Sequence, residues 1–101
     1  MAGKRFTNPR FLTMMVKYTL HPSIAAFIWD KVDKLPEECD YLQVFELYEQ
    51  EGRQWIRHRA EEPQHCTEYK FPCKLASGIV VDKVYVVDDG ERTTMMFSKE
   101  Y

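Results

Sequence analysis

The segment from residue 41 to residue 60 constrains the fold of this chain most, because apolar and polar side chains alternate along it on both sides of Glu51-Gly52. Alternation with a period of two indicates β-strands, and an acidic residue followed by glycine is typical of a hairpin turn. Pairing the strands around this turn gives two faces. One face pairs Tyr48 with Trp55, Glu46 with Arg57 and Val44 with Arg59, and the other pairs Leu47 with Ile56 and Phe45 with His58 and also carries Tyr41. We therefore predict a β-hairpin with the second face in the core and the first on the surface.

The residues before this hairpin predict a strand and a helix. The run from Phe11 to Tyr18 is rich in apolar side chains and is typical of a largely buried strand. Pro22 suits the first turn of a helix, where its missing N–H costs nothing. The apolar residues that follow recur at steps of three and four, which indicates a helix over 22–35 with one face on the core. These residues are Ile24, Phe27, Ile28, Val32 and Leu35.

The residues after the hairpin predict further strands. Residues 66–71 alternate as one strand, and residues 79–87 and 92–97 form a second hairpin around Gly90. Its simplest register pairs Val86 with Thr93, Val84 with Met95 and Asp82 with Phe97. The chain has 101 residues, of which 45% are hydrophobic, and this suffices for one core. We predict a single α+β domain over 1–101, with the helix at about 22–35 packed on a mainly antiparallel sheet of five to six strands.

Composition narrows the function classes. The net charge of −2 gives no overall attraction to nucleic acids or to anionic membranes. The N-terminus lacks an apolar signal segment, and no apolar run approaches the roughly 18 residues that span a bilayer, so we expect a cytoplasmic protein without a membrane partner. The three cysteines Cys39, Cys66 and Cys73 have no close-spaced pair, which favours free thiols.

Chemical motifs are weak, and the pattern therefore favours a protein without enzymatic activity, metal or cofactor. His65, Cys66 and Cys73 are potential zinc ligands, with Cys39, His58 or His21 as a fourth, but ligand pairs two to four residues apart are missing. The sequence contains no nucleophile elbow, and its four glycines lie too far apart for a phosphate-binding loop. For His58, opposite Phe45, we predict a structural role with a hydrogen bond in the core.

The exposed face of the first hairpin leaves three interpretations open. Aromatic and arginine side chains are typical hot spots of protein interfaces, so the leading hypothesis is a protein-binding module. The candidate partner-binding residues are Tyr48, Trp55, Arg57 and Arg59 with the acidic residues Glu46, Glu49 and Glu51. The alternative is a single-stranded nucleic-acid-binding protein, in which the aromatic rings stack on bases beside the guanidinium groups. In the third interpretation Tyr48 and Trp55 only cover a second core.

Several segments resemble a known family. They are Asp40 to Leu47, Ala26 to Asp30, Val86 to Gly90, Thr94 to Met96 and Glu100-Tyr101. Together they are similar to a family of small uncharacterised proteins of low-GC Gram-positive bacteria, first catalogued from staphylococci. The resemblance implies a one-domain cytoplasmic α+β fold, without an assigned activity or catalytic residues. By analogy with small acidic proteins of phages and mobile elements, it suggests an inhibitor or regulator of a host system, comparable to anti-CRISPR proteins. It leaves the oligomeric state open.

Overall fold

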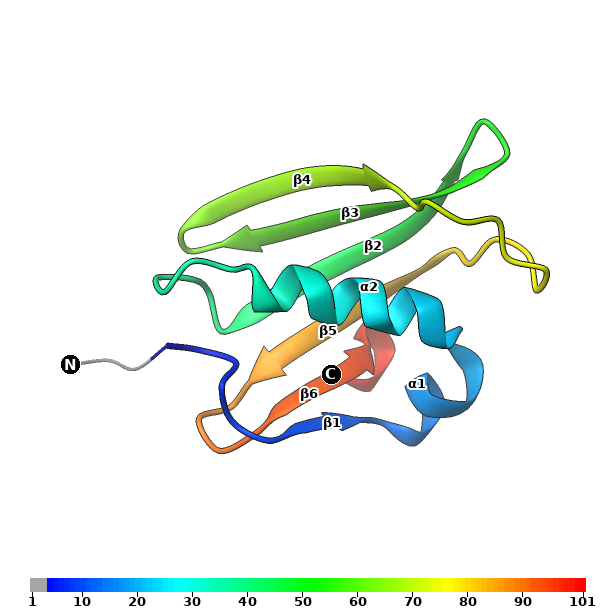
Figure 1. Ribbon diagram of the computed structural model, residues 1–101. Coiled ribbons are helices and arrows are strands. Elements are labelled where there is room, and N and C mark those ends of the chain that lie inside the picture. Colours follow the sequence, from blue (N-terminus) through cyan, green and yellow to red (C-terminus); the bar gives the residue numbers. More distant parts are fainter. Residues whose placement is uncertain (1–3) are drawn as a thin grey trace.

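A computed structural model describes residues 4–101 of the chain. Within these residues, one mixed sheet of six strands carries a long helix on one face (Figure 1). In chain order the elements are β1 (Arg10–Leu12), α1 (Met14–Thr19), α2 (Pro22–Asp33), β2 (Leu42–Gln50), β3 (Arg53–Glu61), β4 (Gln64–Lys70), β5 (Asp82–Asp88), β6 (Thr93–Phe97) and the 3-10 helix η1 (Ser98–Glu100). The predicted α+β class and the helix packed on the sheet are confirmed. None of the helices in this part of the chain is long and apolar enough to cross a membrane.

The strand order across the sheet is β1-β6-β5-β2-β3-β4. Only β1 and β6 pair in parallel, and every other neighbouring pair is antiparallel. Strand β2 therefore lies inside the sheet, between its hairpin partner β3 and the distant strand β5. The edge strand β1 has only three residues, and α1 begins shortly after it, at Met14.

The register of the first hairpin is confirmed. Tyr48 lies opposite Trp55, and Glu46 lies opposite Arg57. At the turn, Glu51 and Gly52 have φ angles of 54° and 71°. Two successive left-handed residues are the mark of a type I′ turn, whose twist matches that of the flanking strands. The turn chemistry therefore fixes which side chains of β2 and β3 share a face.

Helix α2 begins at Pro22 and ends at Asp33, two residues before the predicted end. The His21 ring accepts a hydrogen bond from the Ser23 N–H at 3.1 Å and so caps the first turn. The helix buries Ile24, Ala25, Ile28 and Val32. These side chains pack with the buried residues of the sheet, which include Phe45, Leu47, Ile56, Val84, Val86, Met95 and Phe97. The core thus lies between α2 and one face of the sheet.

Of the strand predicted over 11–18, only Phe11 and Leu12 lie in a strand, β1, whereas residues 14–19 form α1. The chain leaves the sheet at Thr13, whose N–H still donates to the Met95 carbonyl of β6 at 3.1 Å while its hydroxyl accepts from the Val16 N–H at 3.3 Å. A threonine in this position is a helix N-cap, and the methionines that follow favour helix. The apolar content of this segment therefore belongs to a short helix and not to a buried strand.

The predicted register of the second hairpin is also wrong. Val84 pairs with Phe97 and Val86 with Met95, a shift of two residues. The reason lies in the connection, where the Asp89 carboxylate accepts hydrogen bonds from the N–H groups of Glu91 and Arg92 at 2.9 Å. These bonds hold a longer turn than the simplest register allows. A shift by an even number leaves every side chain on its predicted face.

One local prediction needs correction and two are confirmed. Tyr41 is 45% exposed and not in the core, because it precedes β2 next to Asp40, whose carboxylate accepts the Leu42 N–H. His58 is buried as predicted, 4.2 Å from the Phe45 ring and with its Nε2 2.7 Å from the Gln43 Oε1. The cysteines are free thiols, with Cys39 buried and the other two exposed.

Candidate partner-binding face

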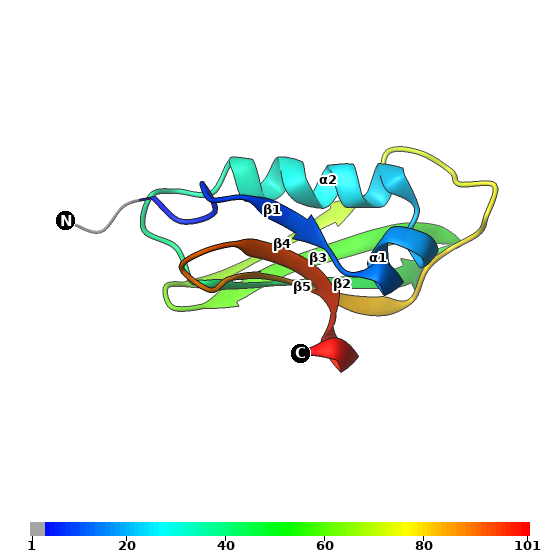
Figure 2. The same ribbon diagram turned by 90° about the horizontal axis from the view of Figure 1, so that it is seen from below.

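The sheet face opposite α2 is largely uncovered. Figure 2 shows α2 on one side of the sheet and only the C-terminal η1 on the other. The side chains on this face are those that alternate with the core residues of β2 to β5. They include Val44, Glu46, Tyr48, Trp55, Arg57, Arg59, Glu68, Lys83 and Tyr85. We call this surface the open face.

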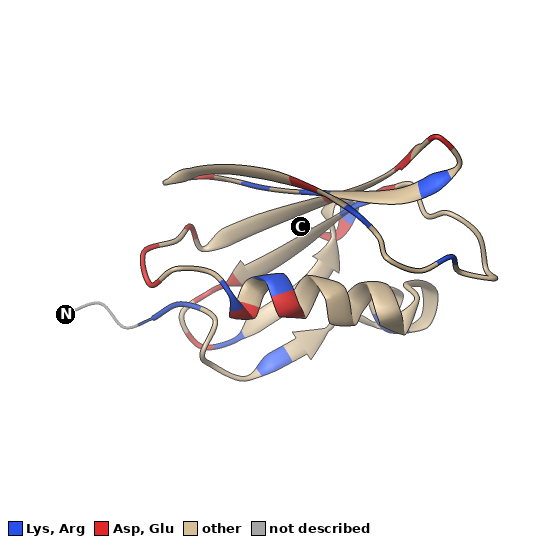
Figure 3. Cartoon of the chain, turned by 45° about the horizontal axis from the view of Figure 1, so that its top comes forward, with Lys and Arg blue, Asp and Glu red and all other residues tan. Residues whose placement is uncertain are grey.

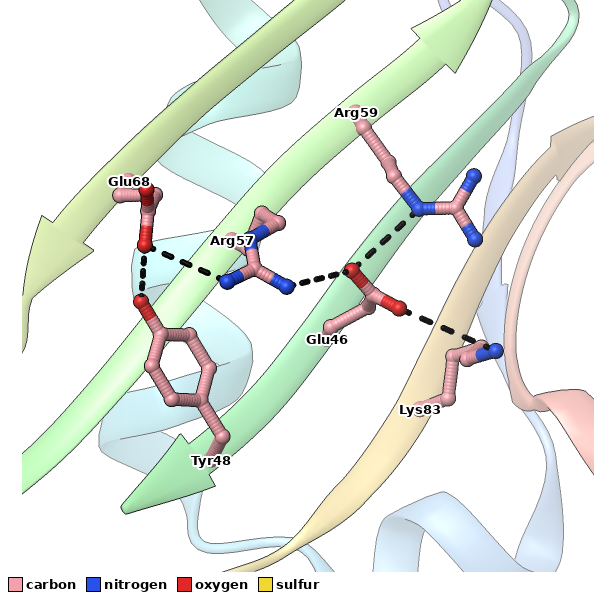
Figure 4. Close-up of polar contacts among 6 residues, drawn as sticks. All are labelled: Glu46, Tyr48, Arg57, Arg59, Glu68 and Lys83. Atoms are coloured by element: carbon pink, nitrogen blue, oxygen red, sulfur yellow. Dashed lines mark hydrogen bonds and ion pairs between the residues drawn. The ribbon is translucent and has the colours of Figure 1, made fainter. Parts of the chain in front are cut away.

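Arg57 lies at the centre of the open face and joins three strands (Figure 4). Its guanidinium nitrogens lie 3.4 Å from carboxylate oxygens of Glu46 on β2 and Glu68 on β4. The same guanidinium group lies 4.9 Å from the centre of the Tyr48 ring, and the Tyr48 hydroxyl donates to Glu68 at 2.5 Å. Arg57 is thus held on both sides by carboxylates and against an aromatic ring.

Glu46 contacts two further cations, Arg59 of β3 and Lys83 of β5. Its carboxylate lies 3.3 Å from the Arg59 Nε and 3.8 Å from the Lys83 Nζ. Three cations, Arg57, Arg59 and Lys83, therefore face two carboxylates, Glu46 and Glu68. This ion-pair network has a net charge of +1 on a protein whose total charge is −2.

Protonation equilibria keep the network charged at neutral pH. The hydrogen bond from Tyr48 lowers the pKa of Glu68, with partial desolvation opposing this and Arg57 adding to it. Desolvation and the hydrogen bond to Glu68 raise the pKa of the Tyr48 hydroxyl. The Glu68 carboxyl group is therefore ionised and the Tyr48 side chain neutral at neutral pH, so the Tyr48 hydroxyl remains a hydrogen-bond donor.

Aromatic side chains flank the network on two sides. The Tyr48 and Trp55 rings are stacked with a centroid distance of 6.4 Å and an interplanar angle of 28°. On the other side, Tyr85 meets the C-terminal Tyr101 edge to face at 5.4 Å. Interaction with the Tyr101 hydroxyl raises the pKa of Tyr41. The open face thus combines rigid aromatic surface with held guanidinium groups.

A shallow hollow of about 270 Å³ adjoins the network at the ends of β2 and β3. Tyr41, Arg59 and Tyr85 contribute to its walls together with Glu61 and Glu62. Among the recesses of the described residues, this one opens on the open face. Its polar walls suit a side chain of a partner better than an apolar small molecule.

Five of the seven predicted site residues lie together on the open face: Glu46, Tyr48, Trp55, Arg57 and Arg59. Glu49 does not, because it pairs with the buried Gln54 and so belongs to the side of α2. Glu51 lies in the hairpin turn and is exposed. Figure 3 shows acidic residues at this hairpin tip, beyond the end of the ion-pair network.

Sequence reasoning missed Glu68, Lys83, Tyr85 and Tyr101 as parts of this surface. The alternation in β4 and β5 indicates the correct face for the first three, but it does not show which strands are neighbours. The pairing of β5 with β2 joins Lys83 to Glu46 across a long stretch of sequence. No local pattern encodes that contact.

The potential metal ligands of the sequence do not assemble. His65 and Cys66 are neighbours in β4, so their side chains point to opposite faces of the sheet. The His65 ring instead contacts the buried His58 ring, at a centroid distance of 4.7 Å. Residues 4–101 contain no group of three histidine, cysteine or acidic side chains arranged to hold a metal ion.

Comparisons with known proteins place the fold. A crystal structure of a protein of unknown function from Enterococcus faecalis is similar, with a TM-score of 0.77 and 19% identity, over 93% of this chain and 91% of that chain. At this identity the likeness shows a shared fold. No curated protein matches the chain significantly. The family model described as staphylococcal protein of unknown function, DUF960, matches residues 9–100, and the chain therefore belongs to that family.

Proposed function

We propose that this protein is a non-enzymatic protein-binding module that uses its open face. The observation that carries the proposal is the position of Arg57, which is held between Glu46 and Glu68 and over Tyr48. Tryptophan, tyrosine and arginine are the side chains that most often dominate the binding energy of protein interfaces. The open face presents all three within one network.

Preorganisation supports this role. The ordering of long side chains at an interface costs entropy and therefore weakens binding. Here the arginines are already held by carboxylates, and the Tyr48 and Trp55 rings are already stacked. A partner surface of carbonyl groups, carboxylates and apolar side chains therefore meets groups that need little rearrangement.

Binding of single-stranded nucleic acid is the second candidate, favoured by the stacked Tyr48 and Trp55 rings and by the net charge of +1 in the network. Stacking of bases on exposed aromatic rings is the usual mode of such proteins. Two carboxylates on the same face weaken the attraction to phosphates, so we rank it below protein binding. The role as an inhibitor of a host system stays a prediction by analogy.

Substitution of both central side chains tests the proposal. The double variant Trp55→Ala/Arg57→Ala and the control Lys34→Ala, on the solvent side of α2, are immobilised beside the wild-type protein. We expect the wild type and the control to retain the same protein from a lysate of a low-GC Gram-positive bacterium. The double variant should retain at least about tenfold less, because it lacks the central anchors.

Folding and nucleic-acid binding are measured on the same samples. The double variant should keep a cooperative thermal transition within about 5–8 °C of the wild type, since exposed ion pairs stabilise little. A collapse of the transition would instead assign these residues to the core. Oligonucleotide binding that weakens steeply with salt and vanishes in the double variant would replace protein binding by the second candidate.

A further inference from the structure

A second exposed surface lies on β1 and α1, at the other end of the sheet from β4 (Figure 1). Its large apolar side chains are Phe11, Leu12, Met14, Met15 and Tyr18, which are 47%, 40%, 67%, 42% and 69% exposed. They occupy only eight consecutive positions of the sequence. Single exposed apolar residues are common on proteins, but such a cluster is typical of an interaction site. We call it the β1–α1 patch.

The geometry of α1 shows that the exposure is not incidental. Successive residues of a helix are separated by about 100° around its axis, so Met14, Met15 and Tyr18 share one side. Val16, on the opposite side, is 1% exposed and anchors the helix in the core. Helix α1 therefore turns an apolar side outward as well as inward. Phe11 continues the patch along the edge strand β1, and Leu12, whose side chain points to the other face of the sheet, forms its margin.

Cations border the patch. The Lys17 Nζ lies 5.7 Å from the centre of the Tyr18 ring, and the Arg92 Cζ lies 5.4 Å from the centre of the Phe11 ring. Among the described residues, neither cation forms an ion pair. The nearby Glu100 is already engaged, because its Oε2 accepts hydrogen bonds from the Thr13 hydroxyl and the Phe97 N–H. In the described part of the chain, the border thus has two cations without a direct ion-pair partner, although Asp89 lies close enough to Arg92 for a longer-range attraction.

We infer that the β1–α1 patch docks an amphipathic helix of a partner protein, with acidic residues beside its apolar stripe. The apolar stripe covers the methionine and aromatic side chains, and the carboxylates pair with Lys17 and Arg92. Methionine side chains adapt to different apolar helices, as in other helix-binding surfaces. The three residues of β1 offer too short an edge for stable addition of a strand.

This surface is separate from the open face, and the inference goes beyond the proposed function. It predicts that the protein contacts two partners, or two parts of one partner. Because the two surfaces share no residue, substitutions in one should leave binding at the other unchanged. If one proposal fails, binding at the other surface can still be measured, so the two failures can be told apart.

Selection of peptides tests the inference directly. The probe is a library of 18-residue peptides with leucine at helical positions i, i+3, i+4 and i+7 and with glutamate, lysine, glutamine or serine at the others. We expect the full-length protein to select peptides rich in glutamate. Met14→Gln/Tyr18→Gln should weaken their binding at least about tenfold. The control variants Val81→Gln, which alters an exposed apolar side chain elsewhere, and Trp55→Ala/Arg57→Ala should bind as the wild type does.

Charge reversal gives the decisive comparison. Lys17→Glu/Arg92→Glu should lose the acidic peptides and select lysine-rich ones instead. Selection without regard to charge, or binding that survives Met14→Gln/Tyr18→Gln, would overturn the inference. It is also overturned if sedimentation shows a dimer that these substitutions dissociate, which would assign the patch to a second copy of this chain. Binding to phosphatidylglycerol vesicles that the same substitutions abolish would assign it to a lipid surface and equally contradict the inference.

Discussion

The buried His58 side chain makes this protein sensitive to mild acid. Burial lowers the pKa of His58 from an ordinary value of 6.5 to about 4, with smaller contributions from His65 and Lys31. Between these values the unfolded chain binds a proton that the folded chain does not bind. The free energy of unfolding therefore falls as the pH drops from 6.5 to 4, by about 3 kcal/mol in total. Chemical denaturation at a series of pH values measures this loss.

The pH range of this loss of stability distinguishes His58 from the carboxylates of Asp40 and Asp88. Hydrogen bonds lower the pKa values of Asp40 and Asp88 against the opposing effect of burial, so their contribution to stability is lost only below their ordinary value of 3.8. In a His58→Gln variant, which can still donate to Gln43, stability should change little between pH 6.5 and 4. A variant with the same acid sensitivity as the wild type would show that another group titrates in this window.

Individual residues also show where sequence reasoning succeeds. The side chains of β2 and β3 on the open face follow from alternation around a turn with a recognisable glycine, so Glu46, Tyr48, Trp55, Arg57 and Arg59 could be grouped correctly. Counting through the same pattern puts Glu49 on the other face. Only the charge of Glu49, and not its position in the alternation, makes it a candidate for the binding face.

At the scale of elements, a single side chain supplies both hydrogen bonds of the Val80 backbone in the loop between β4 and β5. The Gln54 amide donates to the Val80 carbonyl at 2.9 Å and accepts the Val80 N–H at 2.7 Å. Gln54 is 5% exposed, and its amide here takes the place of a neighbouring strand. The loop therefore stays close to β3 although residues 79–81 do not join the sheet.

Removal of this amide should release the loop. In Gln54→Leu, the partly buried N–H and carbonyl of Val80 lose their partners, and we expect amide hydrogens of residues 72–81 to exchange at least about tenfold faster. Hydrogen–deuterium exchange read by mass spectrometry measures this rate. The exposed Gln50→Leu in the same hairpin serves as the control. Equal exchange in the two variants would show that other contacts hold the loop.

Elements that depend on local hydrogen bonds were the hardest to predict. Residues 11–18 have the composition of a buried strand, but the strand ends at Leu12 and the Thr13 cap starts a helix, which leaves three apolar side chains of α1 exposed besides Phe11 and Leu12. The register of β5 and β6 depends on the Asp89 carboxylate and could not be read from the strands themselves. Apolar content alone does not show whether a segment is buried.

At the scale of the whole molecule, Asp88 binds residues that lie 82 and 80 positions away in the sequence. Its carboxylate accepts hydrogen bonds from the Phe6 N–H at 2.9 Å, the Asn8 side chain at 2.8 Å and the Gly90 N–H at 2.9 Å. It thereby connects the N-terminal segment to the β5–β6 turn beside the parallel pair of β1 and β6. Contacts between residues so far apart in the chain leave no recognisable pattern in the sequence.

Loss of this carboxylate should weaken the entire fold. Asp88→Ala leaves the buried Phe6 N–H without an acceptor, and we expect the free energy of unfolding to fall by about 2–4 kcal/mol. Denaturant titration measures the change. Asp88→Asn, which keeps one acceptor oxygen, should lose less. An equal loss in both variants would contradict the role of the hydrogen bonds and point to the charge.

The position of Glu46 has a consequence for how this lineage can diverge. A single carboxylate at the junction of β2, β3 and β5 neutralises part of three neighbouring cations. Exchange of that one side chain for an uncharged one would leave a cationic strip bordered by stacked rings, which is the kind of surface that polyanions prefer. One codon therefore separates the proposed protein-binding surface from one that attracts phosphate backbones.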